Sequence, residues 1–200
     1  MIIDLFRQAK EEELPLKNLK IEAETLTGMQ LAHLEFETVS FIKCRLLECD
    51  FSKTSFTGVQ LLGCDFSGSI FAESFWKKCR IMESKLDGCD FHEARIKESQ
   101  LRESLFYYAN FSQTSWEDSS IADCFLNGAS LAGAKQKSLL MQRVNLQDAD
   151  FFRTSLKGVD LSSCDITNVT VSDTLQELRG SKMNAMQAAG FMCLFGVEIV

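Results

Sequence analysis

Residues 49–71, CDFSKTSFTGVQLLGCDFSGSIF, carry a pattern that belongs neither to a helix nor to an ordinary strand. A large apolar residue returns at every fifth position of this stretch, at Phe51, Phe56, Leu61, Phe66 and Phe71. The same step of five continues without a break from Leu31 to Val171, and Gln136 is its only polar member. A helix repeats every ~3.6 residues and a strand every ~2, so a sustained period of five indicates a solenoid of short repeats.

The other positions of the repeat are also restricted. Two residues before each central residue the side chain is small, as at Cys44, Cys49, Thr54, Val59, Cys64 and Ser69. Glycine recurs two residues after a centre, where a tight turn of type II needs a positive φ, at Gly28, Gly58, Gly63, Gly68, Gly88, Gly128, Gly133 and Gly158. Asp or Asn often precedes the centre, where its side chain can bond the backbone of the turn, at Asp50, Asp65, Asp90, Asn110, Asp150, Asp160 and Asp165.

A second period of 20 residues sorts the centres into four sets. Phenylalanine recurs at this spacing, at Phe51, Phe71, Phe91, Phe111 and Phe151. This predicts a coil of four pentapeptides with one on each side, and we name the sides the Phe41, Leu46, Phe51 and Phe56 faces after one central residue each. About seven to eight such coils at the ~4.8 Å spacing of strands give a rod of roughly 37 Å.

The motifs "CDFSG", "ANFSQ", "ADFFR" and "VDLSS" resemble the repeat of the pentapeptide repeat family, roughly A(D/N)LXX. The resemblance covers about residues 21–175. It implies an all-β solenoid, a right-handed quadrilateral β-helix with four pentapeptides in each coil.

The eight cysteines invite four interpretations: metal ligands, disulfides, redox thiols or core filler. Seven of them occupy the small position before a centre, their closest spacing is five residues, and the two histidines, His33 and His92, fall at outward positions. A zinc site needs convergent ligands in closer pairs, and stacked cysteines with parallel Cβ vectors suit a disulfide poorly. We therefore predict core filler, no metal, no cofactor and no enzymatic activity.

Composition and charge limit the kinds of partner and the cellular location that we expect. The net charge of −7 argues against direct binding to nucleic acid or anionic lipid. No apolar run approaches the ~20 residues of a membrane span, and the N-terminus has no basic and then apolar segment typical of a secretory signal. Unpaired cysteines are typical of the cytosol, where disulfides are rare. We therefore expect a cytoplasmic protein.

The two ends differ from the repeats, which gives three expected segments: a cap over 1–20, the β-helix over 21–175 and a terminal segment over 176–200. In the cap we expect a short amphipathic helix that uses Ile2, Leu5, Phe6 and Ala9 and ends before Pro15. In the terminal segment, Asn184 and Gln187 have the spacing of a capping box and Gly196 that of a helix stop, which predicts a helix near 185–195 and then a strand-like VEIV. Its apolar residues exceed what one end coil needs, so some are expected to pack on a second copy, at Met186, Phe191, Leu194, Phe195, Val197 and Ile199. The alternative is that all of them cap one chain.

The tail pattern G-x-K-M-N-x-M-Q-A-x-x-F-M-x-x-F-G-V-x-I resembles the C-terminal segment of Qnr-type pentapeptide repeat proteins. The resemblance implies a homodimer joined through the tail that binds bacterial DNA gyrase and topoisomerase IV by imitating duplex DNA, and so protects them from quinolones or toxins. Many Qnr proteins interrupt the repeat with loops, whereas the step of five never breaks here. One segment, AKQKSLLMQRV (134–144), departs from the pattern, because Leu139 and Val144 replace small residues and Gln136 an apolar one. We expect a locally distorted coil there.

Outward charges divide unevenly among the faces. The Phe51 and Leu46 faces are acidic, the Phe41 face is balanced and the Phe56 face is basic. The candidate topoisomerase-binding residues are therefore the acids Asp50, Glu73, Asp90, Glu93, Asp150, Glu48, Asp65, Asp87, Asp148 and Asp165. A second candidate is an outward apolar and aromatic patch on the Leu46 face, a contact site unless long neighbours shield it, formed by Leu105, Tyr107, Tyr108 and Phe125. The alternative function is a repeat scaffold for another partner, without topoisomerase activity.

Overall fold

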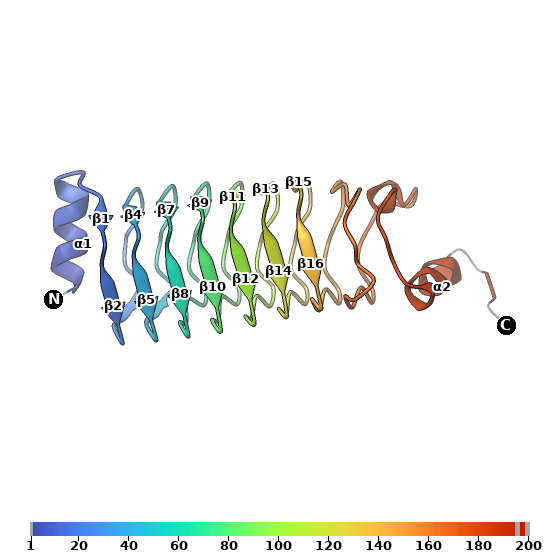
Figure 1. Cartoon of the computed structure of the whole chain (residues 1–200), viewed down its shortest axis with the longest axis horizontal. Coiled ribbons are helices and arrows are strands. Elements are labelled where there is room, and N and C mark those ends of the chain that lie inside the picture. Colours follow the sequence, from blue (N-terminus) through green and yellow to red (C-terminus); the bar gives the residue numbers. More distant parts are fainter. Residues whose placement is uncertain (1, 195–196, 199–200) are drawn as a thin grey trace.

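The computed structural model describes residues 2–194 and 197–198. Short parallel strands stack along one axis, with a helix at each end (Figure 1). Helix α1 (Ile2–Glu11) lies over the first coil, and a 3₁₀ helix, η1 (Gln176–Leu178), and helix α2 (Ala185–Leu194) follow the last. No helix within the described part of the chain is long and apolar enough to cross a membrane. The fold is a parallel β-solenoid, as the step of five predicts.

Four ladders run along the rod, one for each predicted face. The Phe56 face is a seven-stranded sheet of β1 (Leu16–Lys17), β4 (Glu35–Glu37), β7 (Ser55–Thr57), β9 (Phe75–Lys77), β11 (Arg95–Lys97), β13 (Ser115–Glu117) and β15 (Lys135–Lys137). The Phe41 face is a seven-stranded sheet of β2 (Lys20–Glu22), β5 (Ser40–Ile42), β8 (Gln60–Leu62), β10 (Arg80–Met82), β12 (Gln100–Arg102), β14 (Ser120–Ala122) and β16 (Leu140–Gln142). The Leu46 face begins with β3 (Thr25–Thr27) and β6 (Arg45–Leu47) and continues as single bridges, and the Phe51 face consists of single bridges from Gln30 to Thr170.

Every strand pair joins residues 20 apart, as Phe36 pairs with Phe56 and Phe56 with Trp76. Equivalent side chains therefore stack in columns inside the rod. The rings of Phe51 and Phe71 lie 5.2 Å apart and nearly parallel, and those of Phe71 and Phe91 lie 4.9 Å apart. This continuous core confirms the 20-residue coil and the inward direction of the centres.

The small column beside the aromatic core contains the cysteines. All seven that were assigned to it are buried free thiols. Six of them donate hydrogen bonds to backbone carbonyl groups; the Cys64 thiol, for example, donates to the carbonyl oxygen of Phe41 at 3.3 Å and the Cys79 thiol to that of Phe56 at 3.2 Å. The cysteines are therefore core filler that also satisfies buried carbonyl groups.

The corners use left-handed backbone, as the glycine positions predict. All eight predicted glycines have positive φ, but so do many other residues at the same position, among them Thr38, Lys53, Glu93 and Tyr108. A left-handed conformation costs an L residue about 1 kcal/mol or more. Strand pairing on both sides of each corner is therefore strong enough to impose the conformation where no glycine is present.

The N-terminal cap buries fewer of its apolar side chains than the sequence predicts. Helix α1 buries Phe6, whose ring meets that of Phe36 edge-on at 5.8 Å, and Ala9. Leu5, expected on the same apolar side, is instead exposed. A 10-residue helix presents only a narrow stripe to the flat end of the stack, so one of the four expected residues falls outside it.

The segment 134–144 ends both long sheets. Strands β15 and β16 keep the register, yet the coil after them pairs with neither, which agrees with the predicted distortion. Leu139 occupies the buried column in which Ser99 and Ser119 bond successive coils, the Ser99 N–H donating to the Ser119 hydroxyl at 3.1 Å. Leucine is larger than serine and has no hydroxyl. It therefore ends this chain of bonds.

A buried carboxylate completes the C-terminal end of the stack. Glu177 is 1% exposed, and its carboxylate accepts hydrogen bonds from the N–H of Arg153 at 3.0 Å and from the N–H and hydroxyl of Ser172 at 3.1 and 2.7 Å. Burial alone would raise the pKa of Glu177, but these hydrogen bonds outweigh it and lower the pKa below its ordinary value. The side chain takes the place of the carbonyl groups that a further coil would supply.

The corner glycines yield a paired stability test. We expect Gly88→Ala and Gly128→Ala each to cost about 1 kcal/mol in urea unfolding, because both glycines have φ near +65° (+63° and +66°). Only at Gly128 would the new Cβ meet another residue, at 2.6 Å from Cδ1 of Tyr108, whereas nothing lies within 4 Å at Gly88. The ring resonances of Tyr108 should therefore shift in Gly128→Ala alone, and unchanged resonances in that variant would contradict this placement.

Glu177→Gln should lower the free energy of unfolding by about 1–3 kcal/mol, because an amide cannot accept all three hydrogen bonds. Since the folded-state pKa is lowered, the stabilisation is complete above the ordinary value of 4.5 and is lost as the pH falls below it. Urea unfolding between pH 7 and acid should show a weaker pH dependence in the variant. The exposed Glu48→Gln is the control, and equal stability of the two variants at pH 7 would disprove the role of Glu177.

Candidate functional site

Five of the ten acidic candidates hold the turns of the solenoid. The Oδ1 atom of Asp50 accepts the N–H of Ser52 at 2.8 Å, and that of Asp65 accepts the N–H of Ser67 at 3.1 Å. The same bond recurs at Asp90, Asp150 and Asp165. These carboxylates thus stabilise the corners and present negative charge outward at the same time.

The other five acidic candidates lie at the surface, although Asp87 is half-buried and accepts the N–H of Tyr107 at 3.0 Å. Glu73 pairs with Lys53 at 3.6 Å and Asp87 with Lys85 at 3.6 Å, while Glu93 lies 3.5 Å from the His92 ring. The remaining two, Glu48 and Asp148, are exposed. Acids do not follow one another in an unbroken row: in the Phe51 ladder Ile70 separates Asp50 from Asp90, and in the Leu46 ladder Asp65 is followed by Lys85. The structure brings the ten together on two adjacent faces, spaced along the axis.

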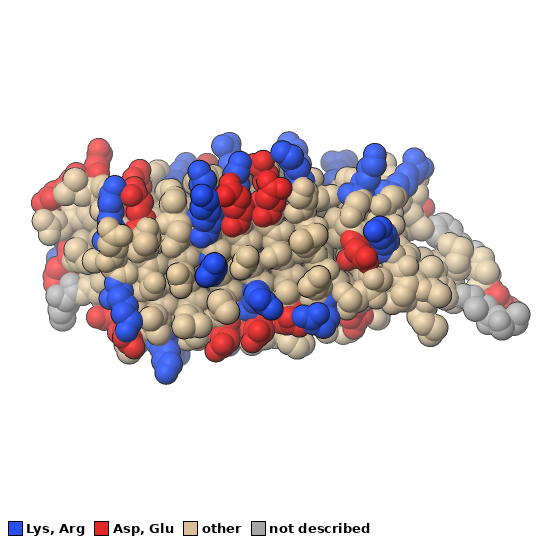
Figure 2. All heavy atoms as spheres, in the orientation of Figure 1, with Lys and Arg blue, Asp and Glu red and all other residues tan. Residues whose placement is uncertain are grey.

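The Phe56 face has the opposite character. Its cations and acids are interspersed along the axis: Lys77 is paired with Lys97, and Glu117 binds Lys97 at 3.1 Å and Lys137 at 3.3 Å. Hydrogen bonds from these two lysines lower the pKa of Glu117, and the bond to Glu117 raises the pKa of Lys97. Figure 2 shows Lys and Arg side chains along the upper edge of the molecule, with acids among them over its middle. The side opposite the Leu46 face is therefore mixed in charge.

The residues of the predicted aromatic patch lie close together on the Leu46 face. Leu105 and Phe125 are neighbours in the Leu46 ladder, and the rings of Tyr107 and Phe125 lie 6.0 Å apart. Tyr108 is 77% exposed and lies across Gly128, while Leu105 and Tyr107 are half-buried. The patch occupies the middle of the Leu46 face, between Lys85 and Asn145.

Sequence reasoning missed one residue beside this patch. The Nδ2 group of Asn127 donates to Oδ1 of Asn145 at 3.0 Å, and the buried Oδ1 of Asn127 has no partner among the described residues. An unsatisfied buried acceptor costs about 1–3 kcal/mol, so this oxygen is a local source of destabilisation beside the patch. The sequence carries no signal for it, since Asn127 holds an outward repeat position like many others.

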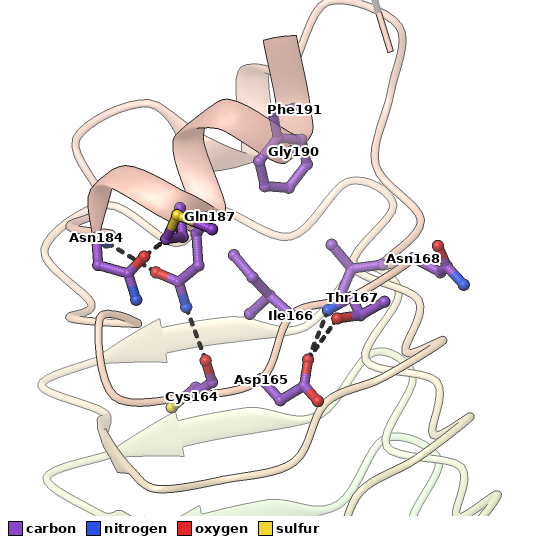
Figure 3. A pocket seen from close by; sticks show the side chains of 11 residues that line it. Cys164, Asp165, Ile166, Thr167, Asn168, Asn184, Gln187, Gly190 and Phe191 are labelled. Carbon is purple, nitrogen blue, oxygen red and sulfur yellow. Dashed lines mark hydrogen bonds between the residues drawn. The ribbon is translucent and has the colours of Figure 1, made fainter. Parts of the chain in front are cut away.

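The C-terminal helix is fastened to the last coil by the predicted capping box. The N–H of Asn184 donates to Oε1 of Gln187 at 2.8 Å, and the N–H of Gln187 donates to Oδ1 of Asn184 at 2.9 Å. The Nε2 group of Gln187 also donates to the carbonyl oxygens of Leu161 and Cys164 at 2.9 and 2.7 Å. A groove of about 460 Å³ remains between residues 164–169 and α2 (Figure 3).

The predicted interface residues of the tail differ in whether they are exposed or buried. Met186 is 83% exposed at the edge of this groove, and Val197 is also exposed. Phe191, expected to pack on a second copy, is instead buried against its own chain, because the capping box turns this side of the helix toward the last coil. The side chain of Leu194, together with Phe195, Gly196 and Ile199, lies outside the described residues, and residues 197–198 are not in a strand.

Six of the seven thiols in the buried column have raised pKa values, and only the pKa of Cys44 is lowered, by its hydrogen bond with Cys64. Burial raises the pKa of Cys79 and of Cys124 to about 11, which keeps both protonated at neutral pH. Among the described residues, no three His, Cys, Asp or Glu side chains converge as a metal site would require. The arrangement is suited to recognition through outward side chains.

Comparison with known proteins assigns the family. A family model described as "Pentapeptide repeat region" matches residues 54–131, and one described as "Pentapeptide repeats (8 copies)" matches residues 35–72 and 140–174; neither describes an enzyme. By sequence, no curated protein matches the chain.

Among solved structures, two trypsin-treated variants of QnrB1, a plasmid-mediated fluoroquinolone resistance protein, are similar to the chain with TM-scores of 0.53 and 0.57. They are 19% and 20% identical to it, and the alignments cover 92% and 94% of this chain and 100% of each QnrB1 chain. At this identity the likeness concerns the fold. The unbroken repeat, the four ladders of residues 20 apart and the matching family models show that this chain belongs to the pentapeptide repeat family.

Proposed function

We propose that this protein is a non-catalytic ligand of bacterial type II topoisomerase, DNA gyrase or topoisomerase IV, and that it binds through the Leu46 and Phe51 faces. The observation that carries the proposal is the similarity of fold over the full length of the QnrB1 chains, a fluoroquinolone resistance protein. The rod shape, the acidic pair of faces and the Qnr-like tail pattern support it. In this function the protein protects the enzyme from quinolones or toxins in the bacterial cytoplasm.

Charge alone is too weak for DNA mimicry. Duplex DNA carries about one charge per 1.7 Å, or roughly 22 over a rod of this length. The chain has a net charge of −7, about a third of that value. The shape of the rod and contacts from the patch of Leu105, Tyr107, Tyr108 and Phe125 therefore contribute the rest of the recognition.

A charge-removal variant can test the acidic faces without disturbing the turns. Asn110 and Asn145 accept the same turn hydrogen bond as the aspartates, each at 3.0 Å, so Asp→Asn removes charge and retains the bond. The fivefold variant changes Asp50, Asp65, Asp90, Asp150 and Asp165 to Asn. We expect the native protein to inhibit gyrase supercoiling or relieve its inhibition by a fluoroquinolone, and the variant to need at least about tenfold more protein.

The matched control removes five acidic charges from the opposite, Phe56 face, by changing Glu35, Glu37, Glu98 and Glu117 to Gln and Asp118 to Asn. Its exposed ion pairs contribute little to stability, so it should behave like the native protein. If both variants lost activity toward gyrase equally, the loss would come from the change in net charge and not from the acidic faces. No inhibition and no protection by the native protein at micromolar concentration would favour the alternative, a repeat scaffold for another partner.

We further propose that two copies join through their tails to form a homodimer. The groove between residues 164–169 and α2 is bordered by the exposed Met186, and Met192 and Val197 add exposed apolar surface nearby in the sequence. An isologous contact would cover this surface on both chains at once.

Met186→Asp should convert the dimer to a monomer of 22.5 kDa in light scattering, because a charge at the centre of an apolar contact is costly to bury. The control Leu62→Asp places the same charge on another exposed apolar residue, in strand β8 and far from the tail. It should leave the mass unchanged. A native protein that is monomeric at micromolar concentration, or a dimer that survives Met186→Asp, would exclude this interface.

A further inference from the structure

Strand pairing on the Phe56 face stops after β15. Up to this strand, the N–H of Lys135 donates to the carbonyl oxygen of Thr114 at 2.8 Å, and the N–H of Asp118 to that of Lys137 at 2.9 Å. Within the described chain, no backbone hydrogen bond repeats these contacts between residues 135–138 and 155–157. On this face two consecutive coils thus lie side by side without backbone pairing, although they pair on the Leu46 and Phe51 faces.

The side chain of Gln136 bridges this gap. Its Nε2 group donates to the carbonyl oxygens of Ser155 at 3.3 Å and Lys157 at 3.0 Å, which replaces the missing backbone donors. The N–H of Ser155 has no such replacement, since no described protein group accepts its hydrogen bond. The gap therefore satisfies its acceptors internally and leaves a backbone donor available.

A groove of about 450 Å³ lies over this gap, lined by Gly133, Ala134, Lys135, Gln136, Arg153, Ser155 and Lys157. Its lining contains three cationic side chains and no carboxylate. No ion pair to Lys135, Arg153 or Lys157 is found in the described part of the chain, whereas Lys78, Lys97 and Lys137 of the same face each bind a glutamate. The guanidinium of Arg153 lies 5.1 Å from the centre of the Phe152 ring, which leaves its N–H groups free to donate to a ligand. Three cationic side chains thus meet at the groove, and the nearby buried carboxylate of Glu177 bonds the backbone N–H of Arg153, not its guanidinium.

We propose that this groove binds a small phosphate-type oxyanion. Lysine and arginine side chains with a backbone N–H are the usual donors for such anions, and the volume is within the range of small-molecule sites. The concentration of cations agrees with the Lys and Arg side chains along the upper edge of the C-terminal half of the rod in Figure 2.

The rest of the surface favours a small anion over a nucleic acid. The molecule carries a net charge of −7, and the neighbouring Phe51 face includes Asp150 and Asp173. A long polyanion that followed the groove would meet this negative field within about a Debye length, ~8 Å at physiological salt. A compact anion can be held by Lys135, Arg153 and Lys157 without leaving the groove.

Amide NMR of the ¹⁵N-labelled full chain, titrated with inorganic phosphate at constant ionic strength, tests the proposal. We expect saturable shifts of the Ser155 backbone amide and of the Gln136 side-chain amide. In the double variant Lys135→Gln, Lys157→Gln the dissociation constant should rise about tenfold or more, because two charged donors are lost. Unshifted resonances of strands β4–β12 in the variant would show that the fold is intact.

The control variant Lys77→Gln, Arg95→Gln removes the same charge from the same face, several coils away, and should bind phosphate as the native protein does. Shifts that rise linearly without saturation, or an equal loss of affinity in both variants, would overturn the proposal. A short DNA duplex, titrated in parallel, should leave the Ser155 amide unshifted. A shift of this amide by the duplex but not by phosphate would also overturn it.

Discussion

The hydrogen bonds between residues 20 apart are the interaction on which the rest of this structure depends. Each strand contributes at most three residues and cannot persist alone. Stacking one coil on the next supplies its partners and places like side chains in columns, as Phe51 lies against Phe71 and Phe71 against Phe91. Because the partner is always one coil away, one inserted residue would turn every later centre out of the core. The unbroken step of five from Leu31 to Val171 is the consequence.

The same ladders explain why the acidic surface has two roles. A corner every five residues needs its backbone N–H groups satisfied, and aspartate before a centre does this while its second oxygen stays outward. Asn110 and Asn145 hold their turns equally well without charge. Structure therefore requires a hydrogen-bond acceptor at these positions but no charge, and the choice of aspartate leaves the negative field of the Leu46 and Phe51 faces open to selection for binding.

Toward the C-terminus, side chains take over from the backbone. Leu139 ends a chain of serine hydrogen bonds, the amide of Gln136 substitutes for lost N–H donors, and the carboxylate of Glu177 substitutes for the acceptors of a missing coil. Gln187 then fastens the last helix to the carbonyl oxygens of Leu161 and Cys164. A solenoid has to end without leaving buried backbone groups unpaired. In this chain, polar side chains pair the backbone groups that the missing coils leave open. The basic groove lies where this replacement of backbone by side chains begins, at Gln136.

The sequence by itself determined the solenoid, the four faces, the inward and outward sides, the turn aspartates and the capping box of Asn184 and Gln187, because each depends on the identity of a residue at a fixed step. Only the tertiary structure decided that Phe191 is buried in its own chain, that Oδ1 of Asn127 lacks a partner, and that Lys135, Arg153 and Lys157 meet at one groove. These outcomes depend on side-chain volumes and on hydrogen bonds between coils. A period in the sequence places residues in register, but it does not determine whether the backbones of two neighbouring coils form hydrogen bonds with each other.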